Sequence, residues 1–227
     1  MPDSDSQLIY HEYHPFYDMC WMAAQNLTEA EAELAAIHKE FPEEKLPRKV
    51  ERQAMALVDE IHMNSIAAPV FALMAAEQLI FVYAARRMTK FKVALEHIDR
   101  LDTEAKWRVI LPMVCGNELR RDSKALADLR LLTRYRNSFV HPKPVIISNL
   151  SDEKIMRLGQ KVEGVTAQRY PLAKRAPTVL IHLAEELCQT DRHRTVRSIV
   201  RDAGIPLPVK PNPAVHRTLR DKAAQRR

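Results

Sequence analysis

Glycine is scarce in this sequence, with only four residues in 227. Strand-rich folds use glycine in many of their turns, so its shortage argues against a fold built from sheets. Aromatic residues are also few, at 6%, so a core must be built mainly from Leu, Ile, Val, Met and Ala. The abundant residues, among them Ala, Leu, Glu and Arg, are good helix formers. Together these features predict an all-α protein.

Cysteine is the second scarce residue. The three cysteines, Cys20, Cys115 and Cys188, are odd in number, far apart and not at the spacing of metal ligands. They argue against a disulfide framework and favour a reducing compartment. The first six residues are acidic and polar and do not resemble a secretory signal. We therefore expect a cytoplasmic location.

A long uncharged hydrophobic run is also missing. The most apolar segment, residues 64–87, approaches the length of a membrane span. However, Glu77 and Gln78 interrupt its middle, and Pro69 lies near its start. Because charged residues are costly inside a bilayer, we expect a buried central helix and no membrane partner.

Positive charge is concentrated at one end of the chain. Residues 191–227, the basic tail, hold ten Lys or Arg and three Asp, which gives a net charge of +7. The rest of the chain holds 25 basic and 26 acidic residues, a net charge of −1. A basic tail suits a polyanion such as nucleic acid, or an acidic partner surface. A solvated tail with no specific partner is the alternative.

Capping and breaking residues predict the order of the helices. Thr28 and Glu31 have capping-box spacing, Asn64 and Ser65 can cap a further helix, and Pro142 stops one. The expected helices cover residues 28–40, 48–62, 64–87, 91–100, 103–114, 122–141, 177–190 and 191–203. The expected irregular parts are residues 1–26, the mixed segment 145–175 with Gly159 and Gly164 as helix breakers, and the linker 204–213.

This order of helices divides the chain into three expected parts. Residues 1–45 are expected to form an N-terminal extension and residues 46–190 a helical domain. Residues 191–227 are expected to form a basic tail that contains several prolines.

The helix expected at 122–141 combines an apolar face with cations. On a helical wheel one face holds Leu126, Leu129, Leu132, Phe139 and Val140. Arg136 falls in the middle of that face. Its flank carries a polar strip made of Arg130, Arg134, Asn137 and His141. Because an unpaired arginine is costly in a core, Arg136 must face a cleft or an interface, or have an anionic partner.

Glu77 is the candidate partner for Arg136. It is the only charged residue between Asn64 and Arg86, so it also needs a partner on its own apolar helix. We expect Glu77 and Arg136 to approach each other as a supporting ion pair, directly or through a hydrogen-bonded neighbour.

The segment Arg136-Asn137-Ser138-Phe139-Val140-His141 resembles the signature of HEPN domains. In that family an Arg, followed by a polar residue, precedes a His near the end of a helix, with four to six residues between them. Here the motif follows a leucine-rich helix, and an apolar helix with a central Glu77 lies upstream. The resemblance covers residues 50–190 approximately, and leaves the N-terminal 45 residues and the basic tail outside.

The resemblance implies an HEPN-like four- or five-helix bundle, here with extra N-terminal helices and a basic C-terminal tail. It also implies a homodimer in which two Arg/His motifs face one cleft and cleave RNA as a metal-independent endoribonuclease. The catalytic residues would be Arg136, Asn137 and His141. Many HEPN proteins belong to toxin–antitoxin, antiphage or stress systems, so a role as a toxin or defence effector with an antitoxin partner is implied as well.

The side chains of the motif fit this chemistry. The RNA 2′-OH is the nucleophile, and His141 would act as general base or acid because an imidazole titrates near neutrality. Arg136 would stabilise charge on the phosphorane, and Asn137 would orient the imidazole or bind a phosphate oxygen. Arg130 and Arg134 would hold flanking phosphates of the RNA.

A non-catalytic explanation fits most of the same residues. His141 could cap the helix C-terminus, where a cationic imidazole is favoured, and Arg136 could belong to a structural ion pair. Some HEPN domains serve only as RNA-binding or dimerisation units, and the basic tail offers an adaptor function of that kind. Pro142 directly follows His141, which departs from the pattern of the family and restricts movement of that histidine.

Metal and cofactor signals are weak. His11, His14 and Cys20 have spacing compatible with zinc, but no fourth ligand is evident nearby. Packing of this aromatic segment on the bundle is the alternative that we expect. The sequence contains no Gly-rich phosphate loop, nucleophile elbow or paired catalytic carboxylates. We therefore expect no metal and no cofactor.

Overall fold

The computed structural model describes residues 15–42, 46–88, 97–120, 122–140 and 152–207, with side chains for all of these except 139–140 and 152–168. Its main helices are α1 (Phe16–Glu40), α2 (Arg48–Arg87), α4 (Thr103–Cys115), α5 (Lys124–Val140), α6 (Asp152–Thr190) and α7 (Val196–Asp202). The described residues contain no strand. The all-α prediction is therefore confirmed, whereas the HEPN-like bundle stays a prediction.

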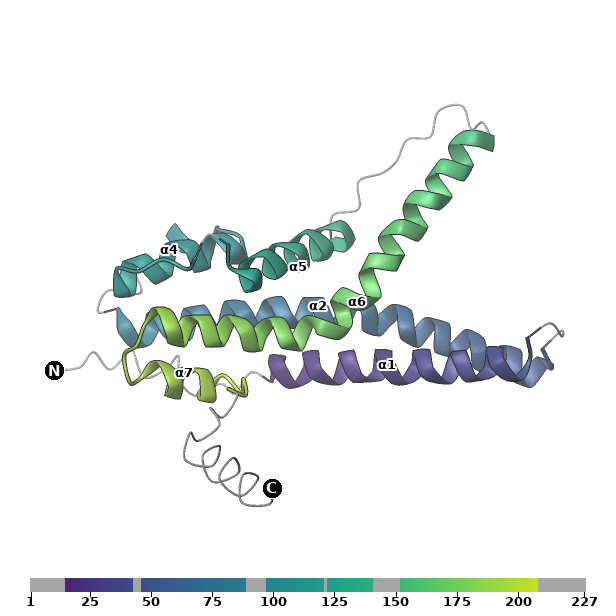
Figure 1. The fold of residues 1–227 in the computed structure, drawn as a ribbon, viewed down its shortest axis with the longest axis horizontal. Coiled ribbons are helices and arrows are strands. Elements are labelled where there is room, and N and C mark those ends of the chain that lie inside the picture. The colour runs from purple at the N-terminus through teal and green to yellow at the C-terminus, as the bar shows by residue number, and fades with distance from the viewer. Residues whose placement is uncertain (1–14, 43–45, 89–96, 121, 141–151, 208–227) are drawn as a thin grey trace, which may run out of the picture.

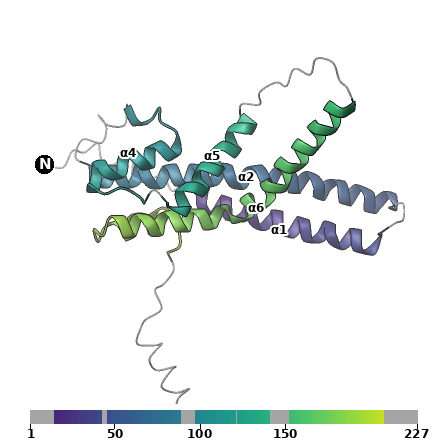
Figure 2. The same cartoon turned by 45° about the horizontal axis from the view of Figure 1, so that its top comes forward.

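α1 and α2 form a long antiparallel hairpin, in which the two helices lie side by side (Figures 1 and 2). α1 begins at Phe16 rather than at Thr28, so the prediction of an irregular segment is wrong for residues 16–26. The reason is a stripe of buried, mostly small residues at helical spacing that packs on α2. It consists of Tyr17, Cys20, Ala23, Ala24, Leu27, Ala30 and Ile37.

α2 runs unbroken where two helices were predicted. Ser65 does not cap a new helix, because its hydroxyl donates to the carbonyl of His62 in the preceding turn at 2.7 Å. Pro69 is accommodated as a buried residue inside the helix. By length and composition α2 is long and apolar enough to cross a membrane, and half of its most apolar window is buried inside the fold. Core helices share this property, so the observation is weak evidence for a membrane span.

α6 passes through both glycines that were expected to break it. Gly159 and Gly164 each cost about 1 kcal/mol relative to alanine in a helix interior, and the surrounding good helix formers offset that cost. The prediction of a mixed segment is therefore wrong for residues 152–175. In Figure 1 the second half of α6 lies along α2, while its first half extends away from the α1–α2 hairpin.

α4 lies close to where it was predicted. Its start is fixed by Asp102, whose side chain accepts from the backbone N–H of Ala105 at 2.8 Å. Its end is fixed by Gly116, which has a φ of 75°. Of the helix predicted at 91–100, residues 91–96 lie outside the described part.

One hydrophobic core extends along the chain from Tyr17 in α1 to Ile205, which follows α7. Leu27 in α1, Leu79 in α2, Leu129 in α5 and Leu183 in α6 are all fully buried within it. The core also includes five residues of the first part of the basic tail, namely Val196, Ile199, Val200, Ala203 and Ile205. The core thus crosses both boundaries that we expected, near residues 45 and 190.

Candidate functional site

α5 is positioned by its buried face. Ser123 caps the helix, since its Oγ accepts from the backbone N–H of Leu126 at 3.1 Å. The leucines of the predicted apolar face are buried, namely Leu126, Leu129 and Leu132. Near the other end, the hydroxyl of Tyr135 donates to the carbonyl of Ser65 in α2 at 3.3 Å. The leucine face is therefore confirmed, and it holds the end of α5 against the middle of α2.

Arg136 and Asn137 lie together near the end of α5. The Arg136 guanidinium donates to Oδ1 of Asn137 at 3.3 Å, with Arg136 partly buried and Asn137 exposed. In the described part of the chain no carboxylate binds Arg136. This contact joins two consecutive residues of the chain, and the third predicted catalytic residue, His141, lies outside the described residues, so the catalytic assignment stays a prediction.

Glu77 has a partner other than the one we predicted. Its carboxylate accepts from Nζ of Lys106 in α4, and that lysine also lies over the ring of Phe81, 4.7 Å from its centroid. The expected direct Glu77–Arg136 pair is not made. The reason is the packing of the helices: α5 reaches α2 at Ser65, twelve residues from Glu77, which corresponds to about 18 Å along a helix axis.

Arg130 is occupied by a carboxylate. Its Nε and Nη2 donate to the two oxygens of Glu104 in α4 at 2.9 and 2.6 Å. The Arg130 hydrogen bond, helped by Arg108 and opposed by burial, lowers the pKa of Glu104 to about 2. Arg134 is exposed and has no ion pair within the described part. Of the two arginines predicted to hold flanking phosphates, only Arg134 is therefore unoccupied.

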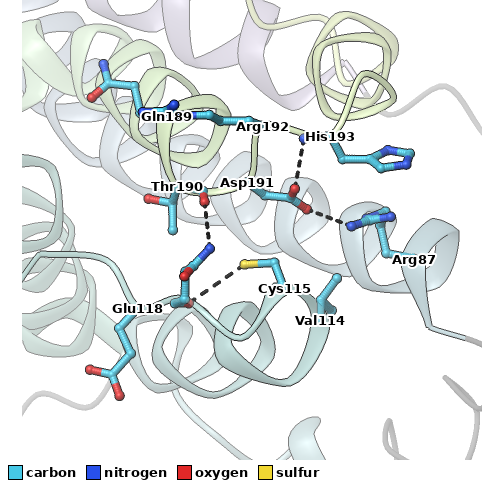
Figure 3. Close-up of a pocket in the computed structure, with 10 residues that line it drawn as sticks. Arg87, Val114, Cys115, Glu118, Gln189, Thr190, Asp191, Arg192 and His193 are labelled. Atoms are coloured by element: carbon cyan, nitrogen blue, oxygen red, sulfur yellow. Dashed lines mark hydrogen bonds and ion pairs between the residues drawn. The ribbon is translucent and has the colours of Figure 1, made fainter.

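An open pocket of about 730 Å³ is a second polar region, which sequence reasoning missed. It lies where the ends of α2, α4 and α6 meet (Figure 3). Its lining residues are Arg87, Val114, Cys115, Asn117, Glu118, Gln189, Thr190, Asp191, Arg192 and His193.

Asp191 is the centre of the hydrogen bonds at this pocket. It accepts from the buried Tyr83 hydroxyl at 2.8 Å, from Arg87 at 3.1 Å and from the backbone N–H of His193 at 2.9 Å. Burial opposes ionisation, but these three donors outweigh it and lower the pKa of Asp191. Because its oxygens are engaged, Asp191 acts as a structural clamp between α2 and the end of α6 rather than as a free base.

The rest of the pocket wall is joined by hydrogen bonds to the backbone. The Asn117 amide donates to the carbonyl of Thr190 at 3.2 Å, and the Cys115 thiol donates to the carbonyl of Leu111 at 3.3 Å. In Figure 3 the side chains of Gln189 and Glu118 point away from each other. The wall therefore holds the helix ends in place but does not converge on a single point.

This clamp has one signal in the sequence. Asp191 is one of only three aspartates among the ten Lys or Arg of the basic tail, so it stands out there as an acid. Its partners Tyr83 and Arg87 lie more than a hundred residues away, so the sequence alone does not identify them.

The zinc candidates are only partly described. Cys20 is fully buried in the core, and burial raises the pKa of its thiol to about 12, so it is a packing residue. His11 and His14 lie outside the described residues. Within the described part, no three His, Cys, Asp or Glu side chains are grouped so that they would hold a metal ion.

Comparison with protein-family models, with curated proteins and with solved structures gives no match to this chain.

Proposed function

We propose that this protein is a metal-independent endoribonuclease of HEPN type that acts through Arg136, Asn137 and His141. One observation carries the proposal. Near the end of α5, Arg136 is hydrogen-bonded to a neutral amide, and no carboxylate among the described residues binds it. A partly buried guanidinium in that state is available to an anion such as an RNA phosphate.

The other arginines around α5 provide a comparison. Arg130 and Arg108 both bind Glu104, and Arg175 binds Asp128 at 2.6 Å. The carboxylates of Glu104 and Asp128 are mostly buried, so each needs a cation to compensate its charge. Arg136 departs from this pattern at the position where the sequence resembles a catalytic motif. Arg134, two residues before Arg136, adds a second cation that no carboxylate in the described part of the chain binds.

The proposed reaction uses only groups of the protein and the RNA. The 2′-oxygen of a ribose attacks the adjacent phosphorus, so a 2′-O–P bond forms and the P–O5′ bond breaks. His141 accepts the 2′-OH proton or donates a proton to the leaving 5′-oxygen. Arg136 neutralises charge on the phosphorane oxygens. Asn137 already contacts Arg136 and would hold the guanidinium in position.

A second copy of the chain completes the proposed site. Cleavage by acid–base catalysis needs one group to accept a proton and another to donate one. One chain supplies a single Arg136–His141 motif, and two motifs facing one cleft in a homodimer would supply both groups. The dimer would place the ends of the two α5 helices next to each other.

The test uses purified protein and mixed single-stranded RNA with EDTA present. We expect cleavage by the full chain. His141→Ala should lower the rate by roughly 10²–10⁴-fold, the usual contribution of an acid–base group, and Arg136→Gln by on the order of 10²-fold.

Lys124→Gln is the matched control for these variants. Lys124 is an exposed cation at the first turn of the same helix, so its loss changes the charge of α5 without touching the motif. The proposal is wrong if His141→Ala and Arg136→Gln cleave as fast as Lys124→Gln. It is also wrong if EDTA abolishes cleavage.

The alternative function is a non-catalytic RNA-binding or adaptor protein that uses the basic tail. The concentration of positive charge in that tail, ten Lys or Arg against three Asp, favours it. Removal of residues 208–227 leaves the buried Ile205 in place, whereas a cut after Ala203 would remove it. RNA binding without cleavage, lost when residues 208–227 are removed, would favour the adaptor.

A further inference from the structure

The part of the chain from residue 192 to residue 201 exposes four arginines. Arg192 and Arg194 lie in the turn before α7, and Arg197 and Arg201 lie one turn apart on α7; all four are exposed. We name these four residues the α7 arginine surface. The segment that carries them contains no lysine.

Apolar residues fix this surface to the protein. Val196, Ile199 and Val200 of α7, and Ile205 after it, are at most 2% exposed. The hydroxyl of Ser198 and the backbone N–H of Ile199 are also bonded to the carbonyl of Thr195, at 2.8 and 3.0 Å. The arginines therefore project from a packed element, and this part of the basic tail is not a free chain.

The two acids that flank this segment are already bound elsewhere. Asp191 binds Arg87, and Asp202 binds Arg86 at 2.5 Å; both arginines belong to α2. No carboxylate in the described part pairs with the four residues of the α7 arginine surface. The aspartates thus attach the segment to α2, and no carboxylate of the described residues compensates the positive charge of the surface.

We propose that the α7 arginine surface binds the phosphate backbone of RNA. It would hold the substrate away from the cleavage site, since Figure 1 shows α5 and α7 on opposite sides of α2 and α6. The inference rests on the proposed function only in taking RNA as the polyanion.

The composition of the surface indicates this class of ligand. A guanidinium presents a planar fork of donors that matches phosphate oxygens, and it is less strongly hydrated than an ammonium group. Insertion into a bilayer would require exposed apolar residues beside the cations, but the apolar face of α7 is buried in the core. Residues 208–227, which follow Leu207, add six more Lys or Arg, which extends the positive charge along the chain.

The experiment measures binding and not cleavage. The probe is a single-stranded 2′-O-methyl RNA oligonucleotide, which cannot be cleaved by 2′-OH attack, and its fluorescence anisotropy is followed over a range of salt concentrations. Changing Arg192, Arg194, Arg197 and Arg201 to Gln in the full chain should reduce the slope of log K against log salt by about 3, at roughly 0.7 per lost phosphate contact. Affinity at low salt should fall on the order of 10²-fold.

A matched variant removes the same charge at the opposite end of the molecule. Lys39, Arg48, Lys49 and Arg52 are exposed residues near the junction of α1 and α2, far from α7 in Figure 1. Changing these four to Gln should leave the slope within about 1 of the original. Equal losses in the two variants, or no loss in the α7 variant, would overturn the proposal.

Two further arms keep the result unambiguous. If the fourfold variant does not fold by circular dichroism, Arg197→Gln with Arg201→Gln should still reduce the slope by about 1.4. Vesicles of one part phosphatidylserine to three parts phosphatidylcholine test the membrane alternative, and loss of vesicle binding with RNA binding retained would overturn the inference. Absence of RNA cleavage would count against the endoribonuclease and not against this surface, because the probe is not cleavable.

Discussion

At the scale of single residues, the arginines of this protein fall into two groups. Those of one group are bound by carboxylates, as Arg130 is by Glu104 and Arg175 by Asp128. Those of the other group, including Arg136 and Arg197, have no carboxylate partner in the described part of the chain. The first group stabilises helix packing, and the second group is available to external anions. This division decides which cations enter the functional proposals.

The contact between Glu104 and Arg130 in the first group makes the free energy of unfolding depend on pH. Its pKa is about 2 in the folded protein against 4.5 ordinarily, mainly because of the hydrogen bond from Arg130. A lowered folded pKa contributes stability that is fully present above pH 4.5 and is lost as the pH falls toward 2. The free energy of unfolding, measured with urea, should therefore fall more steeply over this range in the original protein than in Glu104→Gln.

Glu29→Gln is the control for this titration. Glu29 is exposed on α1 and has no ion pair in the described part, so its replacement removes a carboxylate without removing an arginine contact. Parallel pH profiles for the original protein and Glu104→Gln would show that the Glu104–Arg130 contact does not contribute to stability.

At the scale of elements, the two longest helices pass through residues that often end helices. α2 continues through Ser65 and Pro69, and α6 continues through Gly159 and Gly164. Burial explains the continuity of α2, since Ser65 and Pro69 both lie in its packed face. By contrast, Gly116 does end a helix, because its positive φ of 75° suits the C-terminal cap of α4.

Replacement by alanine should have opposite effects on stability at Gly116 and at Gly159. Gly116→Ala forces a Cβ into the left-handed region, with no neighbouring atom within 4 Å to add a clash, and should destabilise the protein by about 1 kcal/mol. Gly159→Ala lies in a helix interior and should stabilise it by up to about 1 kcal/mol. Thermal unfolding followed by circular dichroism measures both changes. A loss of stability in Gly159→Ala would contradict a continuous α6.

At the scale of the whole molecule, α1 is part of the core. Cys20 and Leu27 are fully buried, and Glu31 of α1 forms an ion pair with Lys174 of α6. The N-terminal extension of the sequence prediction is therefore mostly a structural helix. The first part of the basic tail is likewise attached to α2, through Arg86 and Arg87.

Removal of residues 1–45 should abolish cooperative folding. Three large side chains of α1, Tyr17, Leu27 and Ile37, are buried, and each contributes roughly 1.5–3 kcal/mol. Their sum is comparable with the total stability of many domains, about 5–15 kcal/mol. The shortened chain should bind a hydrophobic dye and lose a sharp thermal transition, whereas removal of residues 208–227 should not. A sharp transition in the chain starting at residue 46 would show that the helical domain folds alone.

The sequence by itself determined the helical class, the buried leucine face of α5 and the position of α4. These depend on the composition and on the spacing of apolar residues within one segment, which are local properties. The sequence also pointed to Arg136 and Asn137 as site residues; the structure adds a hydrogen bond between these two neighbours near the end of α5, and their catalytic role stays a prediction.

Only the tertiary structure decided which charges pair and where helices continue. Glu77 binds Lys106 instead of Arg136, and Asp191 binds Tyr83 across more than a hundred residues. α2 is one helix because packing against α1 and α5 outweighs the capping tendency of Ser65. The physical reason is the same in each case: helix propensity acts over a few residues, whereas the choice of partner depends on which helix faces meet, and distant segments of the chain set those faces.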